Sequence, residues 1–289
     1  MDLIKNQFIF KDKKEIKRLH IQNRLLSEYE EPIFDHLLAG KCGVSVLDIG
    51  SNDGMKTKER FSRDEVSKVI GLEYNAELAR KAQKVYGNEK FSFYPFDVEE
   101  MGFPEKLRSL MEEKKIEGFD VIYLSLVLMH LSDMKKIIVQ IYPFLKDDGH
   151  IVIVEANDEN SVLSPDKEGL LAEYLDILKK DKYSGNREAG KIVGELLEDV
   201  GYENIHVWCE SISAGAGEKE KKKDIFITFF SYLPEDVEIL LEEEPEQEDY
   251  LAWAEWINCN YKKLRHLIVQ ESSAVFMGLR MISCTKGKK

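Results

Sequence analysis

Residues 44–54, V-S-V-L-D-I-G-S-N-D-G, read as a buried strand that runs into a loop bracketed by glycines. The valine, leucine and isoleucine side chains form the apolar run of a strand that is buried on both faces. Asp48 lies just before the turn, and Gly50 and Gly54 can adopt positive φ or approach a ligand closely. A polar, helix-compatible segment follows at residues 55–61. Strand, glycine loop and helix together form the geometry that holds a nucleotide-like cofactor at the carboxyl end of a sheet.

The spacing of the glycines separates cofactor classes. A dinucleotide fingerprint reads G-x-G-x-x-G, and its middle glycine lets the backbone approach a pyrophosphate. Here the loop reads G-x-x-x-G, with Ser51 and Asn52 after the first glycine, and this argues against NAD or FAD. No Gly-Lys-Ser/Thr follows, so the loop is not a P-loop. With Asp48 leading into it, D-I-G-S-N-D-G resembles motif I of class I S-adenosylmethionine-dependent methyltransferases.

A second strand, residues 66–75, ends in the acidic Glu73, nineteen residues after Gly54. A carboxylate at this strand tip can accept both ribose hydroxyls of an adenosine. The same spacing occurs in dinucleotide folds, so it indicates an adenosine ligand without choosing the cofactor. The alternative is a solvent-exposed glutamate at a strand end. Tyr74 follows directly and joins the predicted site.

A third strand, residues 91–98, F-S-F-Y-P-F-D-V, ends in Asp97. The resemblance implies that this acidic residue bonds the adenine amino group, and an amine donor suits a carboxylate acceptor. Val98, beside it, is placed to contact the face of the adenine ring. The competing interpretation is a helix N-cap aspartate ahead of two glutamates.

The fourth strand and its exit are residues 119–131, F-D-V-I-Y-L-S-L-V-L-M-H-L, which carry Ser125 and His130. The N/D-P-P-Y sequence of methyltransferases that act on adenine or glutamine amides is not present there, and V-L-M-H-L is similar to small-molecule methyltransferases. Residues 144–155, F-L-K-D-D-G-H-I-V-I-V-E, closely resemble motif III of the family. The combined order of these segments is far more specific than any one of them.

Five strands alternating with helices predict a doubly wound α/β sheet. The resemblance is strong over residues 41–156 and implies a seven-stranded Rossmann-like methyltransferase sheet. Residues 225–232 and 275–285 both suit the last, antiparallel strand; we choose the second, which makes the residues before it a helical insertion. The predicted organisation is an N-terminal helical cap (1–40), a methyltransferase core (41–214), a helical insertion (215–272) and a last core strand with its tail (273–289).

The N-terminal cap is predicted as a helix over residues 11–38 that Pro32 interrupts. Two interpretations stay open for it. It can pack on the sheet as an ordinary amphipathic helix, or, as the resemblance implies, fold as a lid over the methionine end of the cofactor. In the second case Gln22 and Tyr29 are the side chains that contact the cofactor.

Composition limits the partners. The 289 residues carry a net charge of −13, which repels a nucleic-acid backbone, and the basic run at residues 219–223 is short and interrupted by Glu220. The four cysteines form no C-x-x-C and fit reduced thiols in a cytoplasmic protein. We find no signal peptide and no run long enough to span a membrane. We expect no nucleic acid, no membrane and no metal as partners.

The resemblance therefore implies transfer of a methyl group from S-adenosylmethionine to an oxygen, nitrogen or sulfur of a small-molecule acceptor. The alternatives are an RNA or protein methyltransferase of the same fold and a non-catalytic cofactor-binding protein. His130 is the candidate general base, because its ordinary pKa suits proton removal near neutrality, although a histidine that anchors the loop fits the same pattern. The oligomeric state stays open. The predicted cofactor residues are Asp48, Gly50, Ser51, Asn52, Gly54, Glu73, Tyr74, Asp97, Val98 and Ser125, with Gln22 and Tyr29 from the cap.

Overall fold

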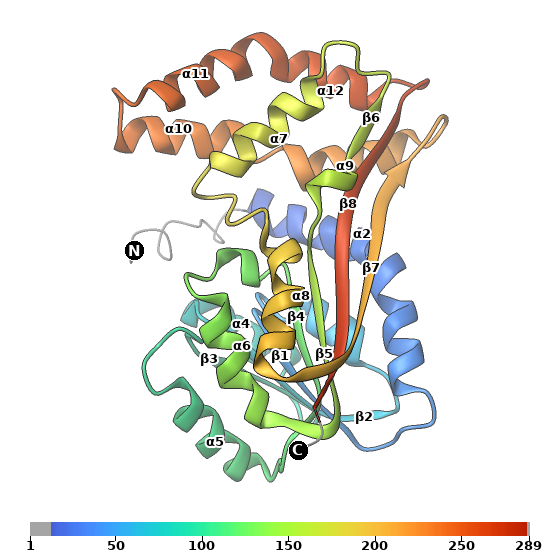
Figure 1. Ribbon diagram of the computed structural model, residues 1–289, viewed down its shortest axis with the longest axis vertical. Helices are drawn as coiled ribbons and strands as arrows, with labels where there is room; N and C mark the ends of the chain where they lie inside the picture. Colours follow the sequence, from blue (N-terminus) through green and yellow to red (C-terminus); the bar gives the residue numbers. More distant parts are fainter. Residues whose placement is uncertain (1–12, 288–289) are drawn as a thin grey trace. The chain divides into compact units, whose positions relative to one another are not determined.

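A computed structural model describes residues 13–287 (Figure 1). Its sheet has the strand order β3-β2-β1-β4-β5-β8-β6, and β7 also pairs with β8. Strands β1 to β5 pair in parallel, whereas β6 and β8 are antiparallel. The strands are β1 Val44–Ile49, β2 Val66–Glu73, β3 Phe91–Pro95, β4 Phe119–Ser125, β5 Leu145–Ala156, β6 Val162–Ser164, β7 Tyr202–Ala214 and β8 Ala274–Lys286.

Helices connect the parallel strands, as the predicted doubly wound fold requires. The α-helices are α2 Lys13–Leu38, α3 Met55–Phe61, α4 Ala76–Tyr86, α5 Phe103–Lys114, α6 Met134–Ile141, α7 Leu170–Lys180, α8 Ala189–Val200, α9 Lys219–Phe230, α10 Leu233–Glu243, α11 Glu248–Trp256 and α12 Lys262–Val269. Short helical turns are η1 Leu128–His130, η2 Tyr142–Phe144, η3 Asp158–Asn160 and the π-helical η4 Ile257–Tyr261. Within residues 13–287, no helix has the length and apolar character needed to cross a membrane.

The chain forms two compact units. The first combines the described residues through Leu26 with Asn157–Arg187 and Glu210–Leu279. The second combines Ser27–Ala156, Glu188–Cys209 and the described residues from Arg280 onward. Residues 1–12 of the predicted cap lie outside the described residues, and residues 13–40 are shared between the units, because the division falls within α2.

The second unit has the parallel sheet at its centre. Every residue of β1 is buried, as expected of a strand covered on both faces. Side chains from β4, β5, α5 and α6 complete one continuous apolar core. The five predicted parallel strands are thus confirmed as β1 to β5, and the carboxyl ends of β1, β2 and β4 lie at one edge of the sheet.

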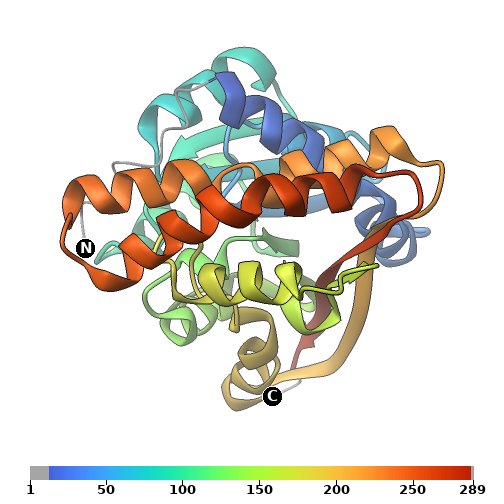
Figure 2. The same cartoon turned by 90° about the horizontal axis from the view of Figure 1, so that it is seen from above.

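The first unit is mainly helical. Aromatic rings of α7 and α9 pack together, with centroids of Tyr174 and Phe230 4.7 Å apart and those of Phe226 and Phe230 5.8 Å apart. Helices α10 and α11 are packed neighbours, which Figure 2 shows from above. The choice of the last strand is confirmed, because β8 covers residues 274–286 whereas residues 225–230 lie in α9.

Two details differ from the prediction. Helix α2 continues through Pro32, which is exposed, so its ring and the lost hydrogen bond face solvent while neighbouring side chains anchor the helix. The short strand β6 was not predicted and brings the sheet to eight strands.

Two glycines of the second unit give opposite predictions for stability. A Cβ on Gly71 of β2 would lie 2.5 Å from the buried ring of Phe93, whereas a Cβ on Gly194 of α8 meets nothing within 4 Å. Gly71→Ala should lower the free energy of unfolding by about 1–3 kcal/mol through overpacking. Gly194→Ala should raise it by about 0.5–1 kcal/mol through helix propensity. Urea denaturation measures both, and equal effects would contradict the packing described here.

Candidate active site

The loop between β1 and α3 is shaped by its backbone. Gly50 and Ser51 donate their N–H groups to the carbonyl of Leu72, at 2.8 and 2.9 Å, which ties the loop to the end of β2. Gly50 and Gly54 have φ of 78° and 81°, and Asn52 has φ of 50°. A Cβ on Gly50 would lie 2.5 Å from a methyl of Val127, so this glycine permits a close approach of two chain segments.

Glu73, at the end of β2, is tied to the same loop. Its carboxylate accepts the backbone N–H of Asn52 at 3.0 Å and that of Asn75 at 2.9 Å. Burial raises the pKa of Glu73, against the lowering effect of these N–H groups. With the backbone N–H of Tyr74, which also lowers this pKa, these bonds use about three of the four lone-pair positions of a carboxylate, so the group retains some acceptor capacity for a ligand.

The residues after β3 lie beside Glu73. The N–H of Phe96 donates to the carbonyl of Glu73 at 3.0 Å. Burial, with the charges of Glu73 and Asp97, raises the pKa of the neighbouring Tyr74 to about 12. Asp97 also accepts the N–H of Glu99 at 2.9 Å in a local turn, but it is not the helix N-cap of the competing interpretation, because the next helix, α5, begins at Phe103 with Gly102 as its N-cap. Glu73, Tyr74 and Asp97 are thus brought together, with the buried Val98 next in the chain.

Asp48 supports the loop from beneath. It is buried and accepts a hydrogen bond of 2.5 Å from the hydroxyl of Thr57 in α3. Burial, assisted by the nearby carboxylates of Glu30 and Glu73, raises the pKa of Asp48 to about 7. Its side chain therefore fixes α3 to β1.

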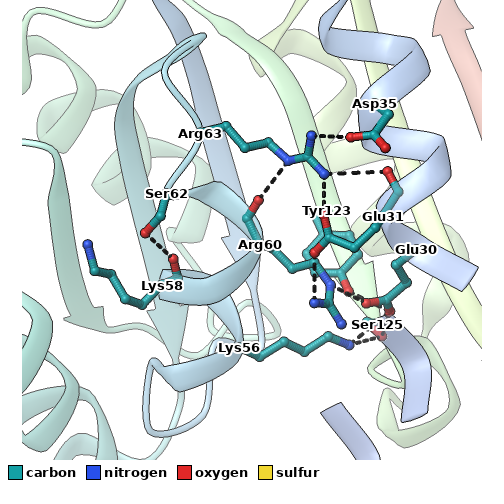
Figure 3. Close-up of polar contacts among 10 residues, drawn as sticks. All are labelled: Glu30, Glu31, Asp35, Lys56, Lys58, Arg60, Ser62, Arg63, Tyr123 and Ser125. Atoms are coloured by element: carbon teal, nitrogen blue, oxygen red, sulfur yellow. Dashed lines mark hydrogen bonds and ion pairs between the residues drawn. The ribbon is translucent and has the colours of Figure 1, made fainter. Parts of the chain in front are cut away.

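Glu30 and Lys56, whose charges act on Asp48, belong to a buried ionic network. Figure 3 shows this network. At its centre, the carboxylate of Glu30 from α2 is 0% exposed. Glu30 Oε1 accepts hydrogen bonds from Lys56 Nζ at 3.0 Å, Tyr123 Oη at 2.7 Å and Ser125 Oγ at 3.0 Å, and Oε2 accepts one from Arg60 Nε at 2.7 Å. Burial favours the neutral acid, but the cations Lys56 and Arg60 lower the pKa of Glu30 to about 2. Helices α2 and α3 and strand β4 meet at this carboxylate.

The network continues toward solvent on the α2 side. Arg60 also donates to Glu31 at 3.0 Å, and Arg63 donates to Glu31 and, at 2.5 Å, to Asp35 (Figure 3). These outer pairs are more exposed and contribute little individually. They extend the attachment of α2 to α3.

The exit of β4 is held by a buried glutamate. Leu126 has φ of 56°, which is uncommon for a side chain of this size. The following N–H groups of Val127 and Leu128 donate to Glu155 Oε1 of β5 at 3.2 and 2.8 Å. This carboxylate fixes the turn that leads into η1, at whose end His130 is exposed.

The structure thus gathers most of the predicted site residues in the second unit. The loop residues, Glu73, Tyr74, Asp97, Val98 and Ser125 lie at the carboxyl ends of β1 to β4. Tyr29 belongs to the same unit and is partly exposed, whereas Gln22 belongs to the first unit, so its predicted contact with the cofactor stays a prediction. No group of three His, Cys, Asp or Glu side chains suited to a metal occurs within residues 13–287.

Sequence reasoning missed Glu30, Lys56, Tyr123 and Glu155. For Glu30 a signal exists: Leu26, Phe34 and Leu38 lie four and eight residues away on one helical stripe and are all buried. A charged residue in the middle of an apolar stripe must find a buried partner. For Lys56 and Tyr123 the sequence gives no such signal, because their pairing depends on tertiary structure.

Comparisons of the sequence with known proteins match it to methyltransferases. A model of a family described as a methyltransferase domain matches residues 12–207. A stretch of 180 residues is 25% identical to the juvenile hormone acid O-methyltransferase of Bombyx mori and covers 60% of this chain and 61% of that protein. The chain thus matches about three fifths of the length of this curated relative.

Solved structures share the fold. The YcgJ protein of Bacillus subtilis has a TM-score of 0.51 and 18% identity, with 88% of this chain and 99% of that chain covered. The plantazolicin methyltransferase BpumL in complex with SAH has a TM-score of 0.51 and 15% identity, with 96% and 89% covered.

The raised pKa of Asp48 predicts a dependence of stability on pH. Its pKa of about 7 in the folded protein exceeds the ordinary value of 3.8, so the folded state favours the neutral acid. The contribution to stability is complete below about pH 4 and is lost as the pH rises to about 7, on the order of a few kcal/mol. Asp48→Asn removes this titration and keeps an acceptor for Thr57. Its free energy of unfolding should therefore fall less than that of the wild type over this range.

Denaturant titrations at several pH values measure the difference. Asp64→Asn, at an exposed position of the same unit, is the matched control and should follow the wild type. If Asp48→Asn also follows the wild type, Asp48 ionises in the folded protein as it does in the unfolded chain.

Proposed function

We propose, since the chain belongs to the methyltransferase domain family, that it transfers the methyl group of S-adenosylmethionine to an oxygen, nitrogen or sulfur atom of a small-molecule acceptor. The observation that carries this proposal is the arrangement at the carboxyl ends of β1, β2 and β3. There a left-handed glycine loop, a buried glutamate and a second carboxylate are connected by backbone hydrogen bonds. Such an edge of a parallel sheet is where adenosine cofactors bind.

The donor set fits an adenosyl group. Glu73 has acceptor capacity for ribose hydroxyls, and Asp97 can accept from an adenine amino group. Tyr74, which is 37% exposed beside these two carboxylates, and Val98 offer apolar surface for the base. Gly50 and Gly54 keep side chains away from the loop that would hold the remainder of the cofactor. When bound, the cofactor supplies an electrophilic methyl group on a sulfonium.

The protein must hold the acceptor in line with that methyl group and exclude water. A thiolate, a carboxylate or a neutral amine needs no base, whereas an alcohol does. The Bombyx mori relative is named for O-methylation of an acid, which lies within the proposed acceptor class. The net charge of −13 disfavours a nucleic-acid acceptor. Incubation with S-adenosylmethionine and a panel of small acids, amines, thiols and alcohols, with release of S-adenosylhomocysteine as readout, tests this function.

Glu73→Ala should weaken binding of S-adenosylhomocysteine. Loss of a hydrogen-bonded charged acceptor costs about 1.5–3 kcal/mol, or roughly a factor of ten to a hundred in affinity. Isothermal titration calorimetry measures the change. Glu89→Ala removes an exposed glutamate from the same unit and should bind as the wild type does. A wild-type protein that prefers NADH over S-adenosylhomocysteine would contradict the proposed cofactor.

His130 is proposed as the general base if the acceptor is an alcohol. It lies at the exposed end of η1, directly after the β4 exit. A base contributes about a hundredfold to ten-thousandfold to the rate, so His130→Ala and His130→Gln should each lower turnover by at least about a hundredfold with cofactor affinity unchanged. Steady-state rates together with calorimetry check this. Near-full turnover in both variants would leave positioning alone as the mechanism.

A further inference from the structure

The network around Glu30 holds more donors than acceptors. Oε1 of this carboxylate accepts hydrogen bonds from Lys56 Nζ, Tyr123 Oη and Ser125 Oγ. A carboxylate oxygen has about two lone-pair directions, so three donors exceed what one oxygen accepts with good geometry. Lys56 also donates to Ser125 Oγ at 2.5 Å. An ammonium has three N–H groups, and the contacts between described residues use two of them. The third N–H of Lys56 has no acceptor among these contacts, and the carboxylate of a ligand would supply one.

Lys56 and Ser125 are the least buried of the residues that donate to Glu30. The side chain of Lys56 is 22% exposed and Ser125 is partly exposed, whereas Glu30 is fully buried and the side chain of Arg60 is 2% exposed. Figure 3 shows the ammonium of Lys56 directed at Ser125 and Glu30. Burial lowers the pKa of Lys56, but Glu30 opposes this effect and favours the cation. The less buried of the two cations that contact Glu30 is therefore a lysine that this glutamate holds in place.

The order of strands places this lysine opposite the adenosine residues. The sheet runs β3-β2-β1-β4, so Asp97 and Glu73 mark one end of the candidate site and Ser125 marks the other. From β3 to β4 there are three strand spacings, roughly 14 Å in total. In S-adenosylmethionine the α-carboxylate lies at the end of the molecule remote from adenine. A cofactor with its adenosine at β2 and β3 therefore extends across the glycine loop toward Lys56.

From these observations we infer that Lys56 binds the α-carboxylate of the cofactor through its remaining N–H, with Glu30 and Ser125 as the residues that position the lysine. This inference rests on the proposed function. An ammonium–carboxylate contact of this kind is a charge-assisted hydrogen bond. Lys56 thereby makes the site selective for the complete cofactor over adenosine fragments that lack the amino-acid end.

The test combines a change in the protein with a change in the ligand. Calorimetry measures the affinities of S-adenosylhomocysteine and of its analogue in which hydrogen replaces the carboxylate, with 5′-methylthioadenosine as a fragment without the whole amino-acid end. The wild type should bind the carboxyl-free analogue roughly tenfold to a hundredfold more weakly than S-adenosylhomocysteine. In Lys56→Met this difference should shrink to less than about threefold, while 5′-methylthioadenosine binds as it does to the wild type.

Lys58→Met is the matched control, because Lys58 is on the same helix but its ammonium lies over the ring of Phe91, 4.5 Å from the centroid. It should keep the full difference between the two ligands. Lys56→Arg should restore part of the difference, and Lys56→Gln, which keeps a donor, provides the same comparison if the methionine variant does not fold. An unchanged ligand difference in Lys56→Met or Lys56→Gln overturns the role of Lys56 and leaves the proposed function standing. Failure of the wild type to bind all three adenosine ligands overturns both.

Discussion

The burial of one carboxylate constrains the second unit. Glu30 occupies a position of α2 that Leu26, Phe34 and Leu38 mark as core, and it is 0% exposed. Burial of an isolated charge costs several kcal/mol, so the folded state requires its partners in place. Because those partners belong to α3 and β4, their donation to Glu30 fixes three elements at once. The rings of Phe34, Phe61 and Tyr123, with centroids 5.1–5.6 Å apart, pack edge to face beside this contact.

Two buried carboxylates a short distance apart illustrate how partners decide charge. The pKa of Glu30 is about 2, because the charges of two cations outweigh the effect of burial. The pKa of Asp48 is about 7, because its hydrogen bond to Thr57 is too weak to outweigh the effect of burial. Near neutrality Glu30 is an anion and Asp48 is partly neutral. The buried side chains next to the glycine loop therefore carry less negative charge than two ionised carboxylates would. This lowers the repulsion that an anionic ligand group would meet there.

The motifs of the sequence predict the part of the site that is local. Glycines with positive φ and an acidic residue at a strand tip each follow from their own segment, and the structure places Gly50, Gly54 and Glu73 accordingly. The continuity of α2 through Pro32 and the partners of Glu30 could not be predicted in this way. Both depend on contacts with α3 and β4, which are distant in sequence, and a proline that reads as an interruption is tolerated when it faces solvent.

This division between local and distant residues has a consequence for selectivity. The proposed adenosine end is built by strand tips that backbone hydrogen bonds hold together, and these bonds do not depend on the identity of the side chains. The proposed carboxylate end depends on Lys56, whose position depends in turn on a glutamate from α2. A change that displaced the second half of α2 would leave the strand tips paired but would remove the partner of Lys56. On this proposal, recognition of the complete cofactor is coupled to the packing of α2, whereas recognition of adenosine alone is not.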